Sequence, residues 1–340
     1  MQSTRFHKIV ERYPALRIAV VGDFCLDRYL EIDPARREVS LETGLPVHNV
    51  VNVRPQAGGA GTILNNLVAL GIGALYPVGF AGEDGEGFEL QRALKNLRGV
   101  KLDFFLQTPQ RRTFTYCKPL VLASDSPPRE LNRLDSKNWE PTPEPVQEQL
   151  AAHFREVSKV VDAVIVLDQV DLPETGVVTA KLRQAIGSQA KLQPSLGILA
   201  DSRRGLAGFP PVDFKMNSRE LGALTGNSRE LPLDQVRSVA ASLARKNGHN
   251  VFVTLADQGM LGADAEGKVE HVSALPLRGE IDIVGAGDAV SANLSASLAA
   301  GASLVEALEL ANAAASVVIH QLGTTGTAGV AQLRSLIEVP

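Results

Sequence analysis

The feature that most constrains the fold is a repeated alternation of short apolar runs with amphipathic segments. The apolar runs are candidate strands at 17–23, 74–80, 163–168, 197–201 and 251–255. The segments of helical period between them lie near 62–70, 84–97, 143–158, 173–186 and 232–247. Strands that alternate with helices predict βαβ units with right-handed crossovers. The sequence therefore predicts an α/β fold, a doubly wound and mostly parallel sheet sandwiched by helices.

Two segments, 28–56 and 104–121, interrupt this alternation. Both are extended and contain no helical period, as RRTFTYCKPLVL illustrates. We expect them to form a small second β-sheet that projects from the main sheet and acts as a lid. The alternation resumes after each of them and no internal repeat occurs, so the chain is predicted to be one domain over 1–340 with the lid inserted in it.

The composition argues against several classes of protein. Apolar residues make up 44% and charged residues 21% of the chain, as in ordinary soluble globular proteins. No apolar run approaches the roughly 20 residues of a membrane helix, and the net charge of −4 disfavours broad nucleic-acid binding. Cys25 and Cys117 lack metal-ligand spacing and fit a reducing compartment. We therefore expect a cytoplasmic protein without membrane or nucleic-acid partners.

The most informative motif is the heptapeptide Asp-Ile-Val-Gly-Ala-Gly-Asp at 282–288. Apolar residues recur every fourth position after it, which predicts a helix from about Gly287 to Gly301. Glycines and an alanine directly before a helix expose backbone N–H groups at the positive end of the helix dipole, where anions such as phosphate bind. A carboxylate at Asp288, beside such an anion hole, suits removal of a hydroxyl proton during phosphate transfer.

Local chemistry alone leaves a second interpretation of this motif open. The glycines can serve tight packing while Asp288 stabilises the helix dipole, with no ligand involved. A dinucleotide-binding loop is a third interpretation, but such a loop should follow an apolar strand, usually early in the chain. This one follows RGEIDI near the C-terminus.

Four motifs together resemble the PfkB, or ribokinase-like, family of carbohydrate kinases. They are the 282–288 heptapeptide, GGAGTILNNLVALG at 58–71, Asn-Ser-Arg-Glu at 217–220 and ANAAASVVIHQLGT at 311–324. Their order and spacing match the family over nearly the whole chain. Within the family the likeness is greatest to bacterial heptose 7-phosphate kinases, through VVGDFCLDRYL, GLPV, ELNRLD and 311–324. Thr62, Ala256 and LDQVDLPETG depart from the usual pattern.

The resemblance implies a ribokinase-like fold and an ATP-dependent sugar kinase. In such an enzyme Asp288 would be the catalytic base, and the N–H groups of Gly285, Ala286 and Gly287 would neutralise the transferred phosphoryl group. The implied sugar-binding residues are Asp23, Asp27, Gly58, Gly59, Thr62 and Asn66. The implied nucleotide-binding residues are Asn217, Glu220, Thr254, Gly259 and Asn312.

The same resemblance implies metals and partners. Asn217 and Glu220 would organise Mg²⁺ through water, although Asn-x-x-Glu is also a helix-capping pattern. Asp282 would border a site for a monovalent cation such as K⁺. The lid would also pair two subunits into a homodimer. Two alternatives remain: a kinase of another acceptor, such as ribose, a ketohexose or its phosphate, or a nucleoside, and a catalytically silent sugar- or nucleotide-binding regulator.

Overall fold

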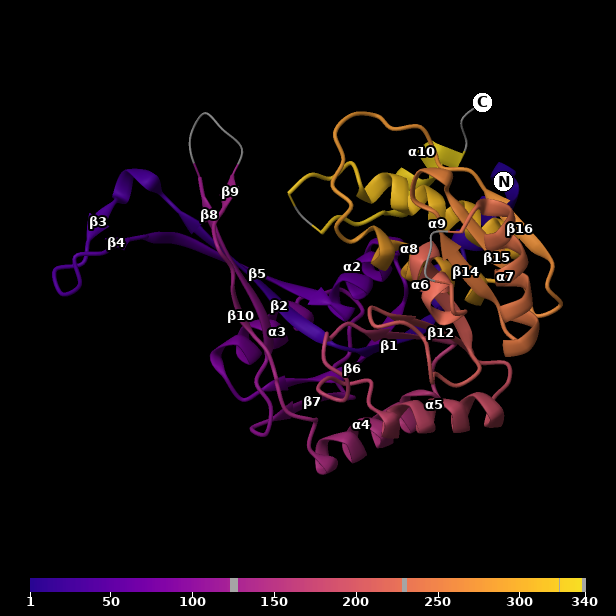
Figure 1. Cartoon of the computed structure of the whole chain (residues 1–340), viewed down its shortest axis with the longest axis horizontal. Helices are drawn as coiled ribbons and strands as arrows, with labels where there is room; N and C mark the ends of the chain where they lie inside the picture. Colours follow the sequence, from indigo (N-terminus) through magenta and orange to yellow (C-terminus); the bar gives the residue numbers. More distant parts are fainter. Residues whose placement is uncertain (123–127, 228–230, 324, 338–340) are drawn as a thin grey trace.

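A nine-stranded sheet forms the centre of the molecule (Figure 1). The computed structural model describes residues 1–122, 128–227, 231–323 and 325–337. The strands are β1 (Arg17–Gly22), β6 (Ala74–Gly82), β7 (Phe105–Thr108), β11 (Ala163–Asp168), β12 (Gly197–Ser202), β13 (Asp213–Asn217), β14 (Val251–Thr254), β15 (Met260–Ala263) and β16 (Val269–Val272). Their order is β16-β15-β14-β13-β12-β11-β1-β6-β7. All neighbours are parallel except β14–β15 and β15–β16, which confirms the predicted fold class.

Helices cover both faces of this sheet. They are α1 (Ser3–Val10), α2 (Ala60–Leu70), α3 (Gly85–Lys95), α4 (Glu144–Val157), α5 (Ala180–Leu192), α6 (Ser218–Leu224), α7 (Leu233–Asn247), α8 (Ala286–Ala299), α9 (Leu304–Val318) and α10 (Val330–Ile337). On β1, Ala19 and Val21 belong to the core cluster that includes α4, α5 and α7, whereas Ile18 and Val20 belong to the cluster on the other face that includes α1, α2 and α8–α10. Because both faces are buried, the strand is continuously apolar, which is the pattern that the sequence displayed.

Helix α5 begins later than the sequence predicted. The expected helix spanned 173–186, but the observed one spans Ala180–Leu192. The Thr179 side chain accepts the Leu182 N–H and so caps the helix start. The residues before it, 169–179, form a loop that follows β11. The helical periodicity of the sequence did not distinguish the end of this loop from the helix, so the predicted helix began too early.

A small sheet projects from the main body and is seen at the left of Figure 1. It contains β2 (Phe24–Ile32), β5 (Val50–Gly59), β8 (Phe114–Val121), β9 (Arg129–Glu130) and β10 (Leu134–Ser136), in the order β10-β8-β2-β5 with β9 on β8. A two-stranded hairpin, β3 (Glu38–Val39) and β4 (Pro46–Val47), lies beyond it. The predicted segment 28–56 belongs to this region.

The second predicted lid segment, 104–121, is divided between the two sheets. Only β8 joins the small sheet, and the prediction is wrong for 105–108, because β7 pairs in parallel with β6 at the edge of the main sheet. The Phe105 ring packs edge-on against Phe24, with centroids 5.4 Å apart. This contact holds β7 beside the start of β2 and the main sheet.

The strand order places a switch point between β1 and β11. The chain leaves β1 towards β6 on one side and returns later to β11 on the other. In open α/β sheets, ligands bind outside the carboxyl ends of the strands at such a point. The residues that follow β1 and β11 therefore face the expected site. None of the helices within the described ranges is long and apolar enough to cross a bilayer.

Candidate active site

The turn before α8 has the geometry of an anion hole. Gly285 caps the helix with φ of 82°, a left-handed conformation that side chains disfavour. The Ala286 N–H donates to the Ile283 carbonyl at 3.2 Å, so one of the three predicted donors is already engaged. The N–H groups of Gly285 and Gly287 make no hydrogen bond to any residue that the structure describes. They remain available to an anion.

Asp288 lies in the first turn of α8, and its carboxylate makes no hydrogen bond within the described ranges. Burial raises the pKa of this carboxyl to about 7, and repulsion from Asp201 adds to the shift. The ammonium of Lys215 partly offsets both effects, and Asp27 adds a smaller repulsion. A carboxylate that has no hydrogen-bond partner among the described residues and a pKa near neutrality has the properties of a general base.

A buried ion pair lies directly beneath this turn. Lys215 Nζ, on β13, is 2.7 Å from Asp201 Oδ2 at the end of β12. The Ser291 hydroxyl of α8 donates to the same Asp201 oxygen at 3.0 Å. A Cβ atom added to Gly287 would lie 3.1 Å from Lys215 Nζ. The positive charge is therefore in contact with the turn that carries the free N–H groups.

The sequence analysis missed Lys215 and Asp201. Burial opposes the charge on Lys215, but the adjacent Asp201 carboxylate outweighs burial and holds the pKa of Lys215 above its usual value. A lysine inside an apolar strand was the available signal, since lysine is almost never fully buried unless it is paired. The strand itself was not predicted, so the signal had no structural context.

A cavity of about 540 Å³ opens next to the anion hole. It contains four of the predicted nucleotide-side positions, Asn217, Thr254, Gly259 and Asn312, together with Ala286 and Gly287. Its other walls are mainly apolar and include Met260, Leu275, Leu277, Ile281, Ile283, Val290 and Ile319. Apolar walls with a few polar groups are typical of small-molecule sites and suit a flat aromatic base.

Asn217 and Glu220 form a reciprocal capping box at the start of α6. The Glu220 N–H donates to Asn217 Oδ1, and the Asn217 N–H donates to Glu220 Oε2, each at 2.8 Å. Glu220 Oε1 makes no hydrogen bond to a described residue and fits a water-mediated contact to Mg²⁺. The capping interpretation is thus observed, and the magnesium role stays a prediction.

Asp282, which was predicted to border a cation site, forms a local turn. Asp282 Oδ1 accepts the Val284 N–H at 3.0 Å, and the Asp282 N–H donates to the Ile319 carbonyl. No cluster of three or more histidine, cysteine or acidic side chains that could hold a metal occurs among the described residues. The monovalent-cation role of Asp282 stays a prediction.

Asp27 lies on β2 above the glycine pair that precedes α2. Its Oδ1 is 2.8 Å from Lys118 Nζ on β8. A Cβ atom at Gly58 would approach Asp27 Oδ2 to 2.2 Å, and one at Gly59 would approach the Asp23 carbonyl to 2.4 Å. Only glycines allow this close approach. Repulsion from Asp27 also contributes to the raised pKa of Asp288.

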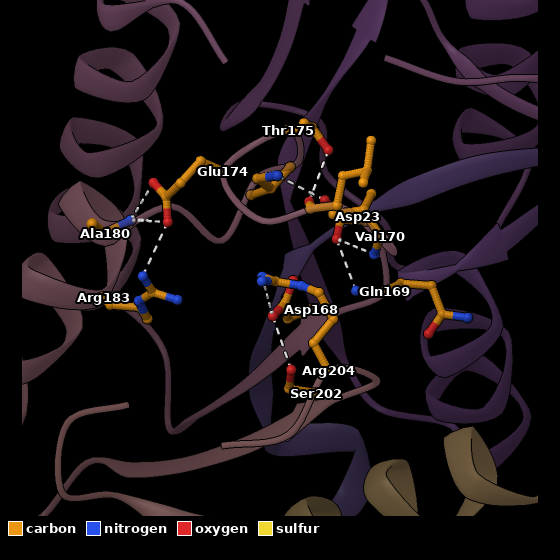
Figure 2. Close-up of polar contacts among 12 residues, drawn as sticks. Asp23, Asp168, Gln169, Val170, Glu174, Thr175, Ala180, Arg183, Ser202 and Arg204 are labelled. Atoms are coloured by element: carbon orange, nitrogen blue, oxygen red, sulfur yellow. Dashed lines mark hydrogen bonds and ion pairs between the residues drawn. The ribbon is translucent and has the colours of Figure 1, made fainter. Parts of the chain in front are cut away.

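Asp23, Thr62 and Asn66 lie in the interior (Figure 2 shows Asp23). The Asp23 carboxylate accepts three backbone N–H groups, from Gln169 at 2.8 Å, Val170 at 3.2 Å and Val177 at 2.7 Å. Burial raises the pKa of Asp23 to about 6, and the neighbouring Asp168 adds to the shift. Both of its oxygens are already engaged, so no sugar contact is needed to explain this residue.

Asn66 and Thr62 are likewise accounted for by internal packing on α2. Asn66 is 0% exposed, donates to the Thr62 carbonyl at 3.0 Å and accepts the Ala328 N–H at 3.3 Å. Thr62 is 2% exposed. These contacts fasten α2 to the segment before α10. The substrate-binding roles of this pair and of Asp23 stay predictions.

The chain matches the sequence profile of the pfkB family carbohydrate kinases over residues 16–329. Among curated proteins, it is 32% identical over 324 residues to the bifunctional protein HldE of Azorhizobium caulinodans and 29% identical over 327 residues to that of Bradyrhizobium sp.. Each alignment covers 94% of this chain. The chain spans 64% and 63% of the lengths of these two relatives.

Solved structures share the fold. Phosphofructokinase-2 from Escherichia coli, in complex with potassium, matches with a TM-score of 0.71 and 21% identity, covering 94% of this chain and 97% of that one. Arabidopsis thaliana ribokinase, complexed with ribose and ATP, matches with a TM-score of 0.65 and 21% identity, covering 96% and 99%. Together with the match over residues 16–329, these findings show that the chain belongs to the pfkB family of carbohydrate kinases, which are phosphotransferases with an alcohol group as acceptor.

Proposed function

We propose that this protein transfers the γ-phosphoryl group of MgATP to a hydroxyl of a sugar or sugar phosphate, with a heptose 7-phosphate-like acceptor as the first candidate. One observation carries the proposal: the Asp288 carboxylate and the N–H groups of Gly285 and Gly287, which make no hydrogen bond to a described residue, lie together in the turn that borders the 540 Å³ cavity. The resemblance to heptose 7-phosphate kinases and the similarity to HldE proteins support the acceptor class.

In the proposed reaction Asp288 accepts the proton of the acceptor hydroxyl as its oxygen bonds to the γ-phosphorus of ATP. The bond from that phosphorus to the bridging oxygen breaks, and ADP leaves with the electron pair. Lys215 and the N–H groups of Gly285 and Gly287 neutralise charge on the phosphoryl oxygens, which is the main protein contribution to phosphoryl transfer. Bound Mg²⁺, organised through water by Asn217 and Glu220, would neutralise charge on the ATP phosphates.

The small sheet is proposed to close over the acceptor and exclude water, which otherwise competes as acceptor. Exposed apolar residues on it and on the adjoining hairpin, among them Val39, Leu41, Leu45 and Val51, also suit pairing of two subunits. Sedimentation equilibrium tests the dimer, since a monomer at all concentrations contradicts it. The buried free thiols of Cys25 and Cys117 fit a cytoplasmic location.

The test is ADP release from MgATP with a panel of acceptors: heptose 7-phosphate, fructose, fructose phosphates, ribose and adenosine. Strong turnover on one acceptor, lost by about 100-fold or more in Asp288→Asn, supports the kinase and identifies its acceptor. Turnover that survives in Asp288→Asn removes this residue from the role of base. ATP binding without turnover on any acceptor favours the silent regulator.

A further inference from the structure

The loop at 169–179, which joins β11 to α5, crosses the switch point of the sheet; we name it the switch-point loop. Asp23 follows β1 directly, and its carboxylate binds this loop at both ends (Figure 2). Oδ2 accepts the N–H groups of Gln169 and Val170, and Oδ1 accepts that of Val177. A side chain that accepts several backbone N–H groups fixes the backbone it binds, so Asp23 holds the two ends of this loop together. We call these three hydrogen bonds the clasp.

Other contacts hold the same loop through its main chain. Arg111 donates to the Thr175 carbonyl, and the Thr142 hydroxyl donates to the Gly176 carbonyl at 2.7 Å. Gly176 packs directly on the clasp, because a Cβ atom there would lie 2.3 Å from Asp23 Oδ1. The backbone of the loop is therefore fixed from β1, from the segment after β7 and from the segment before α4.

One side chain of the loop is left free by this arrangement. Figure 2 shows the Gln169 side chain extending away from the Asp23 carboxylate. Its amide makes no hydrogen bond to any of the residues the structure describes. A carboxamide offers both donors and an acceptor, which is the set that a sugar hydroxyl requires. Gln169 follows the carboxyl end of β11, where ligands of open α/β sheets bind.

We propose that Asp23 is a positioning residue that fixes the switch-point loop, and that Gln169 on this loop contacts a hydroxyl of the acceptor. The inference rests on the proposed kinase function and refines its acceptor site. It assigns acceptor recognition to the loop that Asp23 holds rather than to the Asp23 carboxylate. The loop sequence then influences which sugar is accepted.

The first test is amide hydrogen exchange, which needs no activity. In Asp23→Asn an amide NH₂ group replaces one carboxylate oxygen. This group cannot accept a hydrogen bond, so at least one of the backbone N–H groups loses its acceptor. Exchange at Gln169, Val170 and Val177 should rise by about 10-fold or more in this variant. The control is Asp213→Asn, because Asp213 Oδ1 also accepts a backbone N–H, that of Asn250 at 2.9 Å, at the start of β13. Unchanged exchange in Asp23→Asn overturns the clasp.

The second test is steady-state kinetics with the acceptor that the panel identifies. Asp23→Asn should raise the acceptor KM by about 10-fold while the ATP KM stays within about 2-fold. Gly176→Ala should reproduce this split, and the double variant should be no worse than either single one, because both changes open the same clasp. Gly197→Ala, where a Cβ atom meets nothing within 4 Å, is the matched control. Additive effects, or equal rises in both KM values, refute the positioning role.

Gln169→Ala tests the contact itself. It should raise the acceptor KM without changing amide exchange in the loop or the ATP KM. An unchanged acceptor KM removes Gln169 from the acceptor site. If no acceptor is turned over by the wild-type protein, the kinase proposal fails, whereas the exchange experiment still decides whether Asp23 holds the loop.

Discussion

Replacing Asp288 by asparagine should lower turnover by about 100-fold or more and, above neutral pH, make the protein more stable. The two effects have one cause. Burial and the nearby Asp201 carboxylate raise the pKa of Asp288 from 3.8 to about 7, so the folded protein resists ionising this group. The ionised form is nevertheless the one that accepts a proton from the acceptor. Ionised Asp288 therefore lowers the free energy of unfolding, and a neutral asparagine at this position does not.

The sign of the effect follows from the two pKa values. Below pH 3.8 Asp288 is protonated in both the folded and the unfolded state, and no cost arises. As the pH rises, the unfolded state ionises first and gains relative to the folded state, until the cost is complete above about pH 7. A shift of about three units corresponds to at most about 4 kcal/mol, and about half of this, at most about 2 kcal/mol, arises between pH 5.5 and 8.5.

The assay is urea unfolding of the wild type, Asp288→Asn and the exposed-site control Asp103→Asn at pH 5.5 and 8.5. The stability difference between Asp288→Asn and the wild type should grow by about 1–2 kcal/mol between these pH values. Asp103→Asn should show no such growth. Titrating groups that do not interact with Asp288, such as Asp23, cancel in the difference. A difference that does not change with pH refutes the raised pKa and the reasoning that makes Asp288 the base.

Three further predictions concern other parts of the site. The acid-side fall of kcat/KM should have its midpoint near pH 7, because Asp288 must be ionised to act as base. Lys215→Met should move this midpoint to higher pH, because the lysine charge favours the ionised form of Asp288, and an unchanged midpoint contradicts this electrostatic role. Ala256→Gly should raise the free energy of unfolding by about 1 kcal/mol in urea titrations, since Ala256 has φ of 51°; a less stable variant would show that its side chain contributes more than the strain costs. Adding acceptor with a non-hydrolysable ATP analogue should slow amide exchange in β2, β5 and β8, and unchanged exchange counts against closure of the small sheet.

Strand and helix types could be predicted wherever burial imposed a uniform pattern. The five predicted strands appear because parallel strands covered on both faces are continuously apolar. β13 was missed because Lys215 interrupts its apolar run, and only the partner Asp201, 14 residues earlier, explains a buried lysine there. Residues 105–108 were misassigned because an edge strand of the main sheet and a strand of the small sheet have the same local pattern.

The candidate site was predictable where local backbone chemistry defines it. The glycine turn before α8 and the Asn217–Glu220 capping box could be recognised from adjacent residues. Asp23 and Asn66 could not be interpreted in this way, because each also binds a partner more than 100 residues away along the chain. A polar residue after a strand has the same local sequence pattern whether it binds a ligand or a distant loop.

The strand order also divides the molecule into two contiguous halves. The cavity proposed to bind the nucleotide is lined by residues between Asn217 and Ile319. The candidate acceptor groups, Asp27, Lys118 and the switch-point loop, all precede β12. Asp288 belongs to the second half, and repulsion from Asp27 in the first half contributes to its raised pKa. Chimaeras joined near the start of β12 should therefore exchange acceptor preference between relatives and keep a common nucleotide affinity. The fold allows new sugars to be tried by recombination at a single junction.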